Sequence, residues 1–185
     1  MIDFSKPVRF RGKHAGYAQY LCTERGQKRE GGANVFSRVM DVYLVSILVG
    51  VKYNKTALID DSEIDATSVF GNLKEYLGKK ISSSDINSET VHASQDLLNY
   101  IYRIVMLNSK DKITDEERIA NAFKSDGNEE KISRNFELLN SYSRGGLEIL
   151  YDRFKSCNGD EDEIIRNQLA LYDELSGFDL EMFEE

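Results

Sequence analysis

Residues 34–53 read NVFSRVMDVYLVSILVGVKY and form the longest apolar run in the chain. Apolar positions recur along this run at steps of three or four, namely Phe36, Met40, Tyr43, Ile47 and Gly50. That spacing is typical of one side of a helix, and the valines between these positions make the other side apolar as well. A helix that is apolar most of the way round is a buried one. The pattern therefore predicts a central helix over residues 34–50, with Asn34 as its N-cap and Gly50 as its end.

The composition agrees with a packed, mainly helical protein. The chain has 185 residues, of which 41% are hydrophobic and only 1 is a proline. A chain of this length can bury a core without disulfides or metals, and the scarcity of proline leaves long helices possible. We expect a compact, mainly α, multi-helix domain over residues 1–185, built around the buried central helix. Its ends would be an irregular basic segment over residues 1–33 and an acidic helix and tail over residues 160–185.

Nothing in the sequence predicts secretion or a membrane span. The first residues, MIDFSKPVRF, lack the apolar core of a secretory signal. The central run is shorter than the ~20 apolar residues that a span needs, and it contains Arg38 and Asp41. The 2 cysteines, Cys22 and Cys157, are far apart, so we expect no disulfide framework. These features favour a cytoplasmic protein that does not bind a membrane.

Further helices follow from periodic apolar positions and from helix start signals. A second strong helix is predicted over residues 90–108. Thr114 and Glu117 stand at the spacing of a capping box, with acids in the first turn, which predicts the start of a third helix. The last predicted helix is amphipathic, with apolar positions at Ile164, Ile165, Leu169, Tyr172 and Leu175.

Positive and negative charges are concentrated at opposite ends of the chain. The first 55 residues hold ten Lys or Arg against four acids, whereas the last thirty hold ten acids and a single Arg, within a net charge of -8. Basic residues lie among aromatic ones near the N-terminus, a mixture that phosphate binding and base stacking require. The candidate nucleic-acid-binding residues are Arg9, Arg11, Lys13, Lys28 and Arg29. An ordinary solvated surface explains the same charges equally well, so both interpretations stay open.

The sequence contains no motif that assigns a catalytic or cofactor site. Neither a GxxxxGK[ST] phosphate loop nor a GxGxxG motif occurs. Four acids stand close together, at Asp60, Asp61, Glu63 and Asp65. An EF-hand counted from Asp61 fails, because Ala66 and Asn72 stand where Gly and Glu are needed. Zinc-ligand spacing is also absent among the 2 histidines and 2 cysteines, which are His14, His92, Cys22 and Cys157. We therefore expect no catalytic residue, no metal and no cofactor.

Two stretches together indicate a family. Residues 41–55, DVYLVSILVGVKYNK, form an apolar helix that closes on Gly and a basic segment, and residues 141–154 read SYSRGGLEILYDRF. The second stretch contains a Tyr-x-x-Gly-Gly-Leu-Glu-x-Leu run, made of Tyr142, Gly145, Gly146, Leu147, Glu148 and Leu150. The pair resembles the small accessory proteins associated with Dnd-type DNA phosphorothioation and restriction systems. The resemblance covers about a third of the chain and implies a non-catalytic subunit or adaptor in bacterial antiphage defence.

Three functions follow as expectations. The first is an accessory subunit of a DNA-directed defence complex, with protein subunits as partners and DNA as a further contact. The second is a free-standing nucleic-acid-binding regulator that uses the basic N-terminal third of the chain. The third is a metal-dependent nuclease whose acids form no recognisable motif. Neighbouring genes would discriminate best among these functions.

The Gly145–Gly146 pair provides the candidate partner-binding site. Apolar periodicity predicts one helix that ends at these glycines and another over residues 147–154. Gly145 would close the first helix with a positive φ, and the bare turn would let a partner approach the backbone. An exposed Arg144 would anchor that partner, which makes the predicted partner-binding residues Arg144, Gly145, Gly146 and Glu148.

Overall fold

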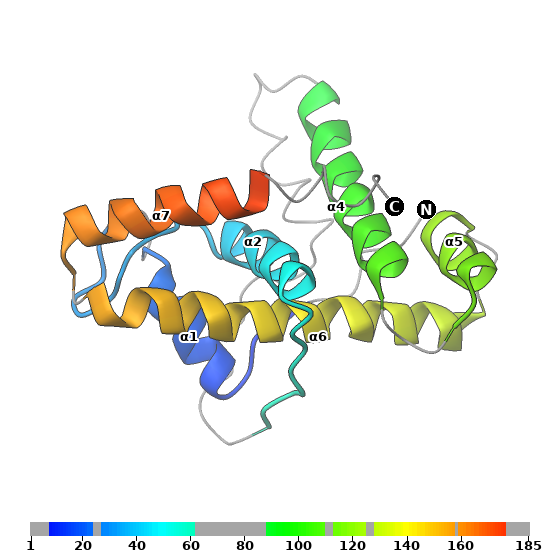
Figure 1. Ribbon diagram of the computed structural model, residues 1–185, viewed down its shortest axis with the longest axis horizontal. Coiled ribbons are helices and arrows are strands. Elements are labelled where there is room, and N and C mark those ends of the chain that lie inside the picture. Colours follow the sequence, from blue (N-terminus) through cyan, green and yellow to red (C-terminus); the bar gives the residue numbers. More distant parts are fainter. Residues whose placement is uncertain are drawn as a thin grey trace. The chain divides into compact units, whose positions relative to one another are not determined.

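The computed structural model describes residues 8–23, 27–61, 88–109, 113–124, 128–157 and 159–176. Within these ranges the regular structure is helical, which confirms the mainly α fold class (Figure 1). The elements are α1 (Lys13–Leu21), α2 (Val39–Lys52), α4 (Ser88–Asn108), α5 (Asp115–Phe123), α6 (Glu129–Phe154), η1 (Lys155–Cys157) and α7 (Glu161–Ser176). Among the described residues, no helix has the length and hydropathy of a transmembrane span.

The chain divides into two compact units. The first unit consists of Met1–Arg9 and Thr67–Asn140, and the second of Phe10–Ala66 and Ser141–Glu185. Each unit has buried apolar side chains of its own. Helix α6 supplies residues to both units, since the division falls between Asn140 and Ser141. A single domain over residues 1–185 stays a prediction.

Helix α2 lies at the centre of the second unit. Val42, Ile47 and Val49 are 0% exposed, and Tyr43 is 1% exposed. They share the core with fully buried side chains of α6, namely Leu147, Leu150 and Phe154. Helices α1 and α7 also contact α2. The buried central helix is therefore confirmed.

The predicted ends of the central helix are wrong. The helix begins at Val39, with Arg38 as its N-cap, and continues past Gly50 to Lys52. Asn34 instead adopts a positive φ of 53°, a conformation that Asn tolerates better than most residues. Its side-chain oxygen accepts a hydrogen bond from the Arg29 amide, and its Nδ2 donates to the Arg29 carbonyl at 2.9 Å. Asn34 therefore closes a turn before the helix rather than capping it.

The first unit is built from α4, α5 and the beginning of α6. Figure 1 shows α4 and α5 next to one another, and the two helices are in contact. The predicted capping box is confirmed, because Thr114 Oγ1 accepts from the Glu117 amide at 3.2 Å and a Glu117 carboxylate oxygen accepts from the Thr114 amide at 3.0 Å. Tyr102 of α4 donates to the Asn121 carbonyl at 3.0 Å and accepts from Asn135 Nδ2 at 2.9 Å. This buried tyrosine thereby joins all three helices.

The predicted break at Gly145 and Gly146 is wrong. Helix α6 runs without interruption from Glu129 to Phe154, and neither glycine has a positive φ. The glycines are explained by packing, because a Cβ on Gly145 would come closer than 3.0 Å to the Lys55 carbonyl oxygen. A Cβ on Gly146 would meet the Ser46 carbonyl oxygen in the same way. Because Gly145 and Gly146 have no side chains, α6 can approach the backbone of α2 and of the segment that follows it.

Small residues on α2 complete this close approach. A Cβ on Gly50 would collide with the Tyr142 carbonyl oxygen of α6. Beside it, the hydroxyl oxygens of Ser46 and Ser143 are hydrogen-bonded at 2.8 Å, and both serines are 0% exposed. At these positions the contact between α2 and α6 is thus made by backbone and small side chains.

Candidate functional site

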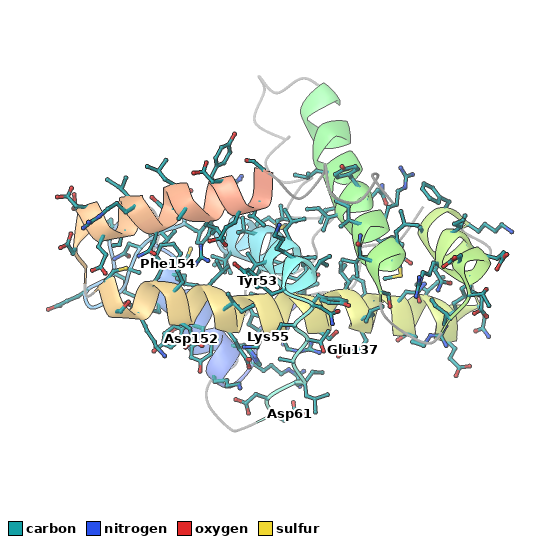
Figure 2. All side chains as sticks on the ribbon, viewed as in Figure 1. Tyr53, Lys55, Asp61, Glu137, Asp152 and Phe154 are labelled. Atoms are coloured by element: carbon teal, nitrogen blue, oxygen red, sulfur yellow. The ribbon has the colours of Figure 1, made fainter. Side chains whose placement is uncertain are left out.

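The strongest concentration of charge in the second unit surrounds Glu148 of α6. Its carboxylate accepts from Lys13 Nζ at 2.8 Å and from Lys55 Nζ at 3.0 Å. His14 Nε2 lies 3.2 Å from the same carboxylate. Figure 2 labels Lys55, which lies on the segment after α2. We call these four residues, Lys13, His14, Lys55 and Glu148, the Glu148 cluster.

The ionisation of the Glu148 cluster follows from burial and pairing. Burial alone would raise the pKa of Glu148, but the hydrogen bonds and charges of Lys13 and Lys55 outweigh it and lower that pKa from 4.5 to about 2. Burial lowers the pKa of His14 below 6.5, although Glu148 acts in the opposite direction. The imidazole is therefore neutral at pH 7 and donates from Nε2. Its buried Nδ1 forms no hydrogen bond with any residue that the structure describes.

This chemistry suits the Glu148 cluster to joining segments of the fold. A carboxylate with a pKa of about 2 stays ionised, so it accepts hydrogen bonds but is a poor general acid. His14 is 0% exposed and cannot reach a substrate in solution. The Glu148 cluster instead ties α1 and the segment after α2 to α6.

The other candidate catalytic groups are buried or occupied. Both cysteines are buried and unpaired, and burial raises the pKa of Cys22, which keeps its thiol protonated. Asp60 Oδ2 accepts from the Lys13 amide at 2.7 Å, and Asp61 pairs with Arg11 at 3.3 Å. Within the described ranges, no three His, Cys, Asp or Glu residues lie close enough together to hold a metal. Glu63, Asp65 and the side chain of His92 lie outside the described residues.

Replacing Glu148 by glutamine is expected to destabilise the protein in a pH-dependent way. Because folding lowers the pKa of Glu148 from 4.5 to about 2, its stabilisation is present above about pH 4.5 and is lost as the pH falls toward 2. Allowing for the exposure of both lysines, the variant should lose on the order of 1–2 kcal/mol at pH 7. Urea unfolding at pH 7 and pH 3 should show this difference shrinking at the lower pH.

Glu30→Gln is the matched control for this measurement, because Glu30 is exposed and has no ion pair with any described residue. Its stability should follow that of the parent protein at both pH values. An equal loss at pH 7 in the two variants would contradict the stabilising role assigned to the Glu148 cluster.

The predicted nucleic-acid-binding residues largely face acids of the same chain. Arg11 pairs with Asp61, Lys13 with Glu148, and Lys28 with Glu161. The Arg29 guanidinium donates to Gln19 at 3.3 Å. Arg9 is exposed and belongs to the first unit, whereas the other four belong to the second. Arg11, Lys13, Lys28 and Arg29 therefore already have partners within the second unit, and nucleic-acid binding stays a prediction.

The expectation of an exposed Arg144 is wrong. Arg144 is only 8% exposed, and its Nε donates to the Ala57 carbonyl at 2.8 Å. Because α6 continues through the glycines, this side chain points to the segment after α2 rather than to solvent. Gly145 and Gly146 are buried as well, and Glu148 belongs to the Glu148 cluster. These residues are used within the chain, and a role for them in binding a partner stays a prediction.

Helix α7 carries the exposed feature that sequence reasoning missed. Its inner side is fixed by buried Leu171 and by Glu174, which accepts from Arg153 at 2.8 Å and from the Tyr53 hydroxyl. Tyr53, labelled in Figure 2, is the residue that follows the last residue of α2. Gln168 Nε2 also donates to the Val35 carbonyl at 3.3 Å. These contacts hold one side of α7 against the second unit.

The adjoining side of α7 presents large apolar residues to solvent. Ile165 is 51% exposed, Leu169 60% and Tyr172 69%. Their steps of four and three place them in one row, which we call the outer stripe. The sequence signal was present, since the apolar positions of this helix cover roughly half of its circumference, more than the buried side of a surface helix requires. Sequence alone did not show which part the rest of the protein covers.

Negative charge borders the outer stripe. Asp162 and Asp173 are exposed, and neither forms an ion pair with any described residue. Both lie next to the outer stripe on the side away from the core, given about 100° of rotation per residue. The outer stripe is therefore an apolar row with a net acidic margin, in which Asp162 and Asp173 outnumber Arg166 of the same side.

Comparisons with known proteins add no relative to this description. No protein-family model, curated protein or solved structure matches the chain. The resemblance to Dnd-associated accessory proteins consequently stays an expectation from the sequence.

Proposed function

We propose that this protein is a non-catalytic adaptor that binds a partner protein through the outer stripe of α7. The observation that carries the proposal is the exposure of Ile165, Leu169 and Tyr172, each more than half accessible and all in one row. Single exposed apolar residues are ordinary on protein surfaces, but a contiguous row of large ones is typical of a binding surface.

The partner surface that fits the outer stripe is an amphipathic helix with basic residues beside its apolar face. Apolar anchors at i, i+4 and i+7 match the spacing with which one helix packs along another. Asp162 and Asp173 border the outer stripe with negative charge that a Lys or Arg of the partner would neutralise. A second copy of α7 fits less well, because the acidic margins of the two copies would repel each other in a symmetric contact.

The family resemblance supplies the proposed biological setting. In that setting the partner is a protein subunit of a bacterial DNA-directed defence complex, and any contact with DNA is made in the assembled complex. Free-standing nucleic-acid binding is less favoured, because Arg11, Lys13 and Lys28 already face carboxylates of the same chain. Cytoplasmic localisation belongs to the same proposal.

The test uses a labelled amphipathic peptide of about 18 residues, with leucines on one side and lysines along its margins. Saturable binding to the parent protein should be measurable by fluorescence anisotropy. Replacing Ile165, Leu169 and Tyr172 together by alanine should weaken binding roughly 100-fold or more, because three apolar anchors that contribute about 1 kcal/mol each amount to about 3 kcal/mol. Folding should be unaffected, since alanine favours a helix and the three side chains are exposed.

Two controls separate this site from unspecific attraction. A scrambled peptide of equal charge should bind weakly and lose its binding as salt increases. Ile119→Ala with Phe123→Ala removes exposed apolar side chains of α5, which are 53% and 57% accessible, and should leave peptide binding unchanged. The proposal would be refuted if the scrambled peptide bound as tightly as the amphipathic one. It would also be refuted if the α7 variant bound the amphipathic peptide as tightly as the parent protein does. A dimer of the parent protein that the α7 substitutions abolish would refute it as well.

A further inference from the structure

A cavity of about 270 Å³ lies within the first unit, at the junction of α4, α5 and α6. Its volume is slightly below the roughly 300–1,000 Å³ of pockets that hold drug-sized ligands, which favours a smaller ligand. Its lining residues are Met106, Ser109, Ile113, Asn121, Arg134, Asn135 and Leu138. Neither α7 nor the Glu148 cluster belongs to this unit, so the cavity is independent of the proposed adaptor function.

The polar groups of the cavity differ in whether they already have partners. Asn135 is 6% exposed and is oriented by the hydrogen bond from its Nδ2 to Tyr102. Asn121 is 7% exposed, yet its side-chain amide forms no hydrogen bond with any described residue. The Asn121 amide is not one of the fully buried described atoms that lack a hydrogen bond, so it is accessible from the cavity and can donate to a ligand there.

Arg134 gives the cavity its positive charge. It lies on α6 one residue before Asn135, is exposed, and forms no ion pair with any residue that the structure describes. A guanidinium presents paired N–H donors that match the two oxygens of a carboxylate. Met106, Ile113 and Leu138 supply an apolar wall for the remainder of such a molecule.

We propose that this cavity binds a small organic monocarboxylate. Arg134 would hold the carboxylate, the Asn121 amide would donate to it or to a neighbouring polar atom, and the apolar wall would take a branched or aromatic body. The volume limits the ligand to on the order of ten non-hydrogen atoms, given that a water molecule in the liquid occupies about 30 Å³. Ligands of this size bind in the micromolar to millimolar range.

Benzoate is a suitable probe, and benzamide is its neutral counterpart of nearly equal shape. Titration of the full-length protein to about 20 mM, followed by ¹H–¹³C NMR of methyl groups, should give saturable shifts at Met106, Ile113 and Leu138. Benzamide should bind at least about tenfold more weakly, because it cannot form the charge-assisted pair with Arg134.

Arg134→Gln should raise the Kd for benzoate about tenfold or more without changing the melting temperature, since Arg134 is exposed. Lys131→Gln removes a nearby positive charge of the same helix that does not line the cavity, and it should bind benzoate like the parent protein. Absence of saturable shifts would overturn the proposal. The proposal would also be overturned if benzamide bound as tightly as benzoate, or if Arg134→Gln and Lys131→Gln weakened benzoate binding equally.

Discussion

Gly146→Ala is expected to destabilise the second unit by roughly 3 kcal/mol or more, a large effect for the addition of one methyl group. The new Cβ would come closer than 3.0 Å to the Ser46 carbonyl oxygen and the Gly50 amide nitrogen. Both atoms belong to the backbone of α2, so no side-chain rotation can relieve the overlap. The two helices would have to separate, which opens the core that they share. Urea denaturation followed by circular dichroism at 222 nm measures the loss.

Gly16→Ala is the control for this substitution. Gly16 also lies inside a helix, but nothing surrounds the position that its Cβ would occupy within 4 Å. Alanine there should stabilise the protein by roughly 0.5–1 kcal/mol, because glycine has the poorer helix propensity. If the two variants shifted the urea midpoint alike, the close approach of α2 and α6 would be wrong.

Ile47→Asp should abolish cooperative folding of the second unit. Ile47 is 0% exposed at the centre of α2, so the substitution places a carboxylate among apolar side chains and removes packing contacts as well. The expected loss exceeds about 4 kcal/mol, which is comparable to the whole stability of a small unit. Thermal unfolding by calorimetry should show the transition of the second unit lost or strongly lowered.

Ile165→Asp provides the comparison within the same unit. Ile165 is 51% exposed on α7, so the same change of side chain there should lower the melting temperature by only a few degrees. An Ile47→Asp protein that melts within a degree or two of the parent would show that α2 is not central.

Local patterns in the sequence determined where most helices form. Apolar positions at steps of three and four identified the buried helix around Tyr43 and Ile47, because a buried face repeats with the period of the helix itself. The capping box at Thr114 and Glu117 located the start of α5, since its hydrogen bonds join residues only three apart. Interactions within one turn of a helix can be inferred from residues that are close together in the sequence.

The continuity of α6 was decided by tertiary structure. Two adjacent glycines are a helix-stop signal by local propensity, yet Gly145 and Gly146 lie inside a 26-residue helix. The cause is a pair of carbonyls 90 and 100 residues earlier in the chain, those of Lys55 and Ser46, which leave no room for a Cβ on Gly145 and Gly146 respectively. The burial of Arg144 against Ala57 follows from the same close approach.

The candidate sites depended on tertiary structure even more strongly. Glu148 contacts Lys13 and His14, and His14 lies 134 residues before Glu148 in the chain. No local sequence pattern predicts such a pairing. Periodicity showed that α7 is amphipathic, but only the packed unit shows that Leu171 is covered while Leu169 and Tyr172 are not. The cavity beside Arg134 likewise depends on tertiary structure, because its lining residues come from three helices and the segment between α4 and α5. The sequence by itself thus determined where most helical segments lie, because helix formation depends largely on near neighbours. Only the tertiary structure decided which charges pair, which apolar surface stays exposed and where a cavity remains, because those depend on residues far apart in the chain.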